Sequence, residues 1–206
     1  MQSEPIDLVL FGAGGDLARR KLLPALMHLE FDELLPEKLR ILALSREETN
    51  VENFMAGQKA TLQAYLGEQR WSKALWETFC QRIYYVRVEF TEVDQYEALH
   101  QELDHAHTSI FYFATPPSLF QGICENLSAA GCLSQNSRVV LEKPIGRDFD
   151  NCKEVNQTVG GFFDEERIYR IDHYLGKETV QNLLALRFAN RFINAQWDNT
   201  CIDHVQ

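Results

Sequence analysis

Along most of the chain, short apolar runs alternate with longer stretches in which apolar residues recur at helical spacing. The apolar runs predict strands at residues 6–11, 39–44, 83–88, 109–114, 137–141 and 167–171. The intervening stretches predict helices at residues 16–30, 50–67, 72–80, 93–105, 117–130 and 148–159. Because strands that alternate with helices pair in parallel and are covered by those helices, we expect an α/β fold with a doubly wound, Rossmann-type parallel sheet.

The regular alternation ends near residue 171. A helix is expected at residues 177–190, and a strand-like run at 201–205 stops at the end of the sequence. An apolar strand without a partner suggests that the chain was cut from something longer. We therefore expect a Rossmann-type domain at residues 1–171 and the truncated start of an α+β second domain at 172–206.

Composition restricts the class of partner. The chain has 206 residues, 45% of them hydrophobic, which is enough for one sizeable core. A formal net charge of −10 argues against nucleic acid or an anionic membrane as the main partner, and still allows a local basic pocket for phosphates. The start of the chain lacks a signal-peptide pattern, and the five cysteines without a Cys-x-x-Cys pair indicate reduced thiols, so a cytoplasmic protein is expected. His105 and His107 have no third ligand nearby, and no metal site is predicted.

A glycine-rich turn follows the first predicted strand and precedes the first predicted helix. Glycine gives such a turn backbone freedom, and bare N–H groups at a helix start attract the pyrophosphate of a dinucleotide. The order departs from G-x-G-x-x-G because Leu17 stands at the third glycine position, but the spacing Gly12, Gly15, Ala18 keeps small residues at the points of close approach. We predict a coenzyme loop, with an ordinary tight turn as the alternative, formed by Gly12, Ala13, Gly14, Gly15, Asp16, Leu17, Ala18 and Arg19.

The end of the second predicted strand indicates which dinucleotide would bind. That position normally presents an acid to the ribose of NAD and a cation to the 2′-phosphate of NADP. Here Ser45 offers a hydroxyl and Arg46 a planar fork of donors, and the first acid is Glu47. NADP is therefore the expected cofactor. The alternative is a solvated Arg46 that pairs with Glu47 or Glu48.

Lys143 stands directly before a proline at the carboxyl end of a predicted buried strand. In doubly wound folds, ligands bind outside this edge of the sheet. Pro144 restricts Lys143 to extended geometry and is a candidate for a cis peptide bond, which would fix where the ammonium group points. The alternative is an ordinary surface lysine that follows a strand.

The stretch from Arg170 to Glu178 places a carboxylate, an imidazole, a phenol and an ammonium group close together, which suits an anionic substrate with hydroxyl groups. If a helix begins near Tyr174, then His173 and Lys177, four positions apart, project to one side of its first turn and can hold one phosphate. Backbone N–H groups and the Tyr174 hydroxyl would add hydrogen bonds. Asp172 is not needed to hold the phosphate and would have a different role. The alternative is that Asp172 and His173 form a hydrogen-bonded pair with a purely structural role.

Taken together, the forms Gly-x-x-Gly-Asp-Leu-Ala, Glu-Lys-Pro and Asp-His-Tyr-Leu-Gly-Lys-Glu, in this order, resemble the glucose-6-phosphate dehydrogenase family. The resemblance implies an oxidoreductase that transfers hydride from C1 of glucose 6-phosphate to NADP and yields a lactone, as the first step of the oxidative pentose phosphate pathway. It also implies a homo-oligomer in the intact enzyme. Members of the family are more than twice as long, and their histidine base lies in a later segment, so we expect little turnover from this chain alone.

The resemblance implies individual roles as well. Lys143 would touch both coenzyme and sugar, and Asp172 would support the histidine base, which makes these two the expected catalytic residues. The sugar phosphate would be seated by His173, Tyr174 and Lys177, and Ala114 and Pro116 would pack beside the nicotinamide. Two alternatives stay open: a non-catalytic NADP-binding module of the same fold, and a dehydrogenase that acts on another sugar phosphate.

Overall fold

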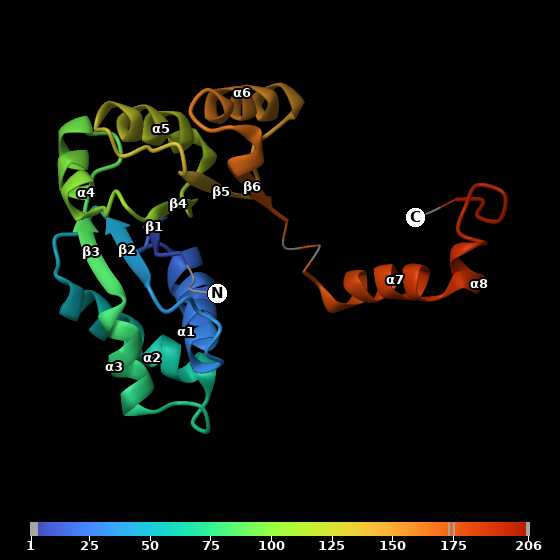
Figure 1. Ribbon diagram of the computed structural model, residues 1–206, viewed down its shortest axis with the longest axis horizontal. Coiled ribbons are helices and arrows are strands. Elements are labelled where there is room, and N and C mark those ends of the chain that lie inside the picture. Colours follow the sequence, from blue (N-terminus) through green and yellow to red (C-terminus); the bar gives the residue numbers. More distant parts are fainter. Residues whose placement is uncertain (1–3, 173, 175, 205–206) are drawn as a thin grey trace. The chain divides into compact units, whose positions relative to one another are not determined.

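A computed structural model of the chain describes residues 4–172, 174 and 176–204. The chain divides into two compact units, Met1–Arg170 and Ile171–Gln206. A six-stranded sheet with the strand order β3-β2-β1-β4-β5-β6 forms the centre of the first unit (Figure 1). This order is that of the Rossmann fold, so the expected doubly wound α/β architecture is confirmed.

The strands follow the apolar runs of the sequence closely. Each begins and ends within one residue of its predicted range: β1 (Ile6–Phe11), β2 (Leu39–Ser45), β3 (Ile83–Arg87), β4 (Thr108–Phe113), β5 (Arg138–Glu142) and β6 (Ile168–Ile171). The pairs β1–β2, β1–β4, β2–β3 and β4–β5 are parallel, and Val9 in β1 stands opposite Leu42 on one side and Phe111 on the other. Helices cover both faces of the sheet, so the central strands are apolar almost throughout.

Two layers of helices enclose the sheet (Figure 1). One hydrophobic cluster joins one face of the sheet to α1 (Leu23–Phe31), α2 (Val51–Leu66) and α3 (Lys73–Gln81). A second cluster joins the opposite face to α4 (Tyr96–Glu102), α5 (Phe120–Ala129) and α6 (Phe149–Gly160). These two clusters form the core that holds the strand ends in place.

Side-chain caps explain where three of the helices begin. The side-chain oxygen Oδ1 of Asn50 accepts from the Asn53 N–H at 2.9 Å, the Ser72 hydroxyl from the Leu75 N–H at 3.1 Å, and the Asp148 carboxylate from the Asn151 N–H at 2.8 Å. Such caps satisfy N–H groups that lack a partner in the first helical turn. The sequence places these helix starts to within one residue because the capping residues are visible in it.

The first helical segment departs from its predicted form. It is helical from Asp16 onward, but Ala18–Leu22 winds as a π-helix in which the Leu23 N–H donates to the Ala18 carbonyl. Pro24 offers a physical reason, because it has no N–H to donate and its ring would press on the carbonyl four residues earlier in a regular α-helix. A wider turn relieves that contact, and such turns are frequent at functional sites.

The second unit contains α7 (Glu178–Ala189) and α8 (Arg191–Asn194). The prediction of a strand at 201–205 is wrong for residues 201–204, which form no strand. Val205 lies outside the described residues. Asp198 accounts for the difference: its carboxylate accepts from the Thr200 N–H at 2.8 Å, and its carbonyl accepts from the N–H of Cys201 and Ile202. These local bonds favour a turn over an extended strand. None of the helices in the described part of the chain combines the length and apolar character that a membrane crossing requires.

Candidate functional site

The glycine turn is held between the ends of β2 and β4, the two strands that flank β1. The N–H groups of Gly12 and Ala13 both donate to the Leu44 carbonyl at the end of β2, at 3.1 and 2.9 Å. Gly12 has a φ of 83°, and a Cβ atom there would lie 2.9 Å from the Ala114 carbonyl oxygen that follows β4. Only glycine combines this backbone angle with this close approach.

The other two glycines also leave bare backbone at points of contact. A Cβ atom on Gly14 would lie 3.0 Å from Ser45 Oγ, and one on Gly15 would lie 3.1 Å from the Gly12 carbonyl oxygen. Ala18, the third member of the predicted small-residue spacing, is fully buried. The spacing Gly12, Gly15, Ala18 therefore marks three positions where a small residue is needed. Gly14 is a further such position; it belongs to the predicted coenzyme loop but not to that spacing.

A hollow of about 400 Å³ opens beside this turn, at the carboxyl ends of β1 to β4. Ligands of doubly wound sheets bind at this edge. Seven residues of the predicted coenzyme site line it: Gly12, Gly14, Gly15, Ser45, Arg46, Ala114 and Pro116.

The other predicted coenzyme residues lie away from this lining. Ala13 is buried in the core like Ala18, and Leu17 is half-buried. Asp16 forms an ion pair with Arg20 at 2.7 Å, and Arg19 Nε donates to Gln58 Oε1 at 3.3 Å.

Five further residues of the lining are not among the predicted site residues: Glu47, Glu89, Phe90, Thr115 and Leu119. Glu89 and Phe90 follow β3, so the rule that parallel strands end at one edge could have found them. The Thr115 hydroxyl is buried, and it forms no hydrogen bond within the described part of the chain. A buried unpaired hydroxyl beside a glycine cradle fits a site built for a polar ligand such as a dinucleotide.

Arg46 is exposed on the wall of this hollow, next to the buried Ser45. Within the described part of the chain Arg46 forms no ion pair, and Glu48 pairs with Arg87 at 3.9 Å instead. The alternative in which Arg46 pairs with Glu47 or Glu48 therefore does not describe this structure. Glu47 also faces the hollow, with Oε1 3.4 Å from the position of a Cβ atom on Gly14.

Lys143 leaves the sheet at the carboxyl end of β5 and is exposed. The Lys143–Pro144 peptide bond is cis, as the sequence had suggested. The preceding residue, Glu142, accepts a hydrogen bond from the Tyr112 hydroxyl of β4. Pro144 lines a neighbouring hollow of about 350 Å³ together with Arg147 and Asn151.

The described residues of the substrate cluster in the second unit are linked by local hydrogen bonds. The Asp172 carboxylate accepts from the Tyr174 N–H at 3.0 Å, the Lys177 N–H donates to the Tyr174 carbonyl at 3.1 Å, and Lys177 Nζ lies 4.9 Å from the centre of the Tyr174 ring. The helix predicted at 177–190 is confirmed, since α7 spans Glu178–Ala189. The condition that a helix begins near Tyr174 is therefore not met. The Asp172 side chain and Gly176 favour a turn over helix here. His173 lies outside the described residues.

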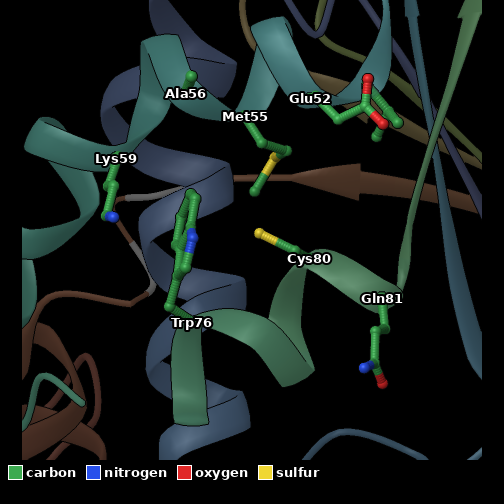
Figure 2. A pocket seen from close by; sticks show the side chains of 8 residues that line it. Glu52, Met55, Ala56, Lys59, Trp76, Cys80 and Gln81 are labelled. Atoms are coloured by element: carbon green, nitrogen blue, oxygen red, sulfur yellow. The ribbon is translucent and has the colours of Figure 1, made fainter. Parts of the chain in front are cut away.

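A third hollow, of about 420 Å³, lies between α2 and α3. Figure 2 shows the Cys80 sulfur atom turned toward the end of the Met55 side chain beside the Trp76 ring, with Lys59 at the rim. Burial raises the pKa of the Cys80 thiol, in keeping with the apolar wall. The glycine turn is the better candidate site because a cation, a hydroxyl and bare backbone converge there.

The described residues include no group of three or more His, Cys, Asp or Glu side chains placed to hold a metal ion.

Comparison with known proteins bears on this site. Residues 9–182 match the family model described as glucose-6-phosphate dehydrogenase, NAD binding domain. The chain is 42% identical over 205 residues to glucose-6-phosphate 1-dehydrogenase of Rhizobium meliloti strain 1021, covering 98% of this chain and 42% of that protein. It is 44% identical over 209 residues to the enzyme of the same name from Gluconobacter oxydans strain 621H, covering 100% and 43%.

Solved structures agree with these sequence matches. Glucose-6-phosphate 1-dehydrogenase from Mycobacterium avium superposes with a TM-score of 0.84 at 29% identity, over 96% of this chain and 42% of that one. A glucose-6-phosphate dehydrogenase in complex with its substrate glucose-6-phosphate gives a TM-score of 0.83 at 30% identity, with the same coverage. The chain thus spans about 42% of the length of the relatives it matches.

Proposed function

The chain belongs to the glucose-6-phosphate dehydrogenase family, and on that premise we propose that it provides the coenzyme-binding part of an NADP-dependent glucose-6-phosphate dehydrogenase. The reaction would move hydride from C1 of glucose 6-phosphate to NADP and give 6-phosphoglucono-1,5-lactone and NADPH. The observation that carries the proposal is the bare glycine turn, packed on Ala114, beside a hollow lined by Ser45 and Arg46.

The residues at this edge suit a phosphorylated dinucleotide. Bound NADP would supply the hydride acceptor. The turn from Gly12 to Gly15 leaves room for a pyrophosphate, and the helical segment that starts at Asp16 adds N–H groups without intrahelical partners. Arg46 would hold the 2′-phosphate with its planar fork of donors, assisted by the Ser45 hydroxyl. Ala114 and Pro116 would border the nicotinamide end.

The substrate roles are assigned from the family signature. Lys143 would contact both coenzyme and sugar, and Asp172 would orient the histidine base that accepts the proton from the C1 hydroxyl. His173, Tyr174 and Lys177 would seat the 6-phosphate; of these, Tyr174 and Lys177 already share one turn. The intact enzyme would be a cytoplasmic homo-oligomer of the oxidative pentose phosphate pathway.

Calorimetric titration of NADP and of NAD into this chain tests the proposal directly. We expect weak binding with NADP tighter than NAD, because Arg46 gains a partner only from the 2′-phosphate. With glucose 6-phosphate present, we expect little NADPH formation, since the histidine base lies in a later segment of related enzymes. Equal or tighter binding of NAD, failure of both dinucleotides to bind, or turnover near that of a full-length enzyme would each contradict the proposal.

A further inference from the structure

The hydrogen bond between Tyr112 and Glu142 connects two strands at the edge where the coenzyme site lies. Tyr112 stands opposite Val140 in the parallel register of β4 and β5, and its hydroxyl donates to Glu142 Oε1, two residues further along β5. Tyr112 and Glu142 are both half-buried. Burial and the Glu142 carboxylate both raise the pKa of Tyr112, so its phenol stays protonated and remains the donor.

This side-chain bond extends the contact between the two strands. The register of β4 with β5 ends at the pair Phe113 and Leu141. Glu142 follows that pair, and Lys143 comes directly after Glu142. The Tyr112 hydroxyl therefore holds β5 one residue beyond its backbone pairing, at the point from which Lys143 leaves the sheet.

The same stretch of β4 also contacts the glycine turn. Ala114 comes two residues after Tyr112, its N–H donates to the Phe11 carbonyl at 3.1 Å, and its own carbonyl oxygen lies against Gly12. Tyr112 thus contacts the residue before Lys143, and Ala114, just after β4, contacts the coenzyme turn. A carboxylate on a half-buried sheet face needs such a partner, because an unpaired one would be costly to desolvate.

We propose that Tyr112 is a positioning residue, whose hydroxyl holds Glu142 and thereby sets the direction of Lys143 relative to the glycine turn. The inference deepens the proposed function and rests on it, because it requires Lys143 to contact bound NADP. Tyr112 itself would touch neither coenzyme nor sugar.

A double-mutant cycle on NADP affinity tests this inference. Tyr112→Phe removes the hydroxyl, and we expect it to weaken NADP binding about three- to tenfold, the range of one hydrogen bond. In a Lys143→Met background the same change should have less than about a twofold effect, since the group that Tyr112 positions is gone. Equal effects in both backgrounds would overturn the inference and leave the proposed function standing. Failure of the unmutated chain to bind NADP would overturn both.

Two controls separate positioning from general stability. Tyr96→Phe removes another tyrosine hydroxyl bond, to the Phe90 carbonyl at 3.0 Å, and its effect on NADP affinity should be the same with and without Lys143→Met. Glu142→Gln keeps an acceptor for Tyr112 and should retain affinity within about twofold, whereas Glu142→Leu should lose as much as Tyr112→Phe. Equal affinities for the Gln and Leu variants would contradict the inference, even if Tyr112→Phe failed to fold.

Discussion

His107 Nδ1 lies 2.8 Å from Oδ1 of Asp7, although the two residues are 100 positions apart in the chain. The Asp7 side chain is fully buried, accepts a second hydrogen bond from the Asp104 N–H at 3.0 Å, and has Arg40 Nε at 3.6 Å. This network ties the start of β1 to the loop before β4, at the edge of the sheet opposite the glycine turn. His107 is thus a structural partner of a buried carboxylate.

Removing that carboxylate should destabilise the fold. We expect Asp7→Ala to lower the free energy of unfolding by about 3 to 5 kcal/mol, because Arg40 and His107 would lose their buried partner. Urea denaturation followed by circular dichroism measures the change. Asp94→Ala, at an exposed position, is the matched control and should stay within about 0.5 kcal/mol. Equal effects of the two substitutions would contradict a structural role for the network.

The glycine turn allows a second paired test. Gly12→Ala places a methyl group at a φ of 83° and 2.9 Å from the Ala114 carbonyl oxygen, so we expect a loss of about 1 to 3 kcal/mol and a loss of NADP binding. Gly57→Ala adds the same methyl group in α2, where nothing lies within 4 Å, and should stabilise by about 0.5 to 1 kcal/mol. Thermal melts and calorimetry distinguish these outcomes, and tolerance of Gly12→Ala in both assays would argue against the cradle.

Arg46 should determine the preference between coenzymes. We expect Arg46→Ala to weaken NADP binding about ten- to a hundredfold while NAD binding changes little, because a charge-assisted bond to the 2′-phosphate is lost. Calorimetric titration of both dinucleotides gives the ratio. Arg87→Ala removes an arginine of the next strand end, which pairs with Glu48, and should leave the ratio unchanged. An unchanged ratio in Arg46→Ala would rule out its role at the 2′-phosphate.

Two buried thiols make stability depend on alkaline pH. Burial raises the pKa of both Cys124 and Cys132 to about 12, from an ordinary value of 9.0. These thiols favour the folded state below pH 9, and that contribution is lost between about pH 9 and pH 12, because only the unfolded chain ionises them there.

Replacing one of these thiols should reduce that dependence. We expect the unmutated chain to lose unfolding free energy between about pH 8 and pH 10. In Cys124→Ala this loss should be smaller by about 1.4 kcal/mol. Urea denaturation in a reducing buffer at the two pH values gives this difference. The exposed Cys201→Ala should show the same pH dependence as the unmutated chain, and a Cys124→Ala variant that behaved likewise would contradict this account.

Those parts of the fold that local chemistry determines could be predicted from the sequence. Strands such as β1 are largely apolar because both faces of the sheet are covered, and helix starts such as Asn50 and Ser72 carry their own caps. The π-helical turn required knowing how Pro24 would be accommodated. The strand expected near Cys201 failed because Asp198 forms local hydrogen bonds.

The site was predicted where a motif marks it and missed where only the strand order creates it. Gly12 and Arg46 stand beside strand ends that the sequence reveals, and both line the hollow. Glu89 and Phe90 belong to no motif and reach the hollow because β3 ends at the same edge. The Tyr112–Glu142 bond depends on the register of two strands that are far apart in sequence, which no local pattern records.

The central pairing of β1 with β4 also has a consequence for biosynthesis. During translation β1 is made before the other strands of this sheet, and one of its two neighbours is made about a hundred residues later. Until then the edge of β1 that will pair with β4 has no partner on the nascent chain, and the Gly12 turn lacks the wall that Ala114 provides. A ribosome-bound chain that ends before Thr108 should therefore expose an open strand edge to chaperones, and the dinucleotide cradle can close only after β4 has left the exit tunnel.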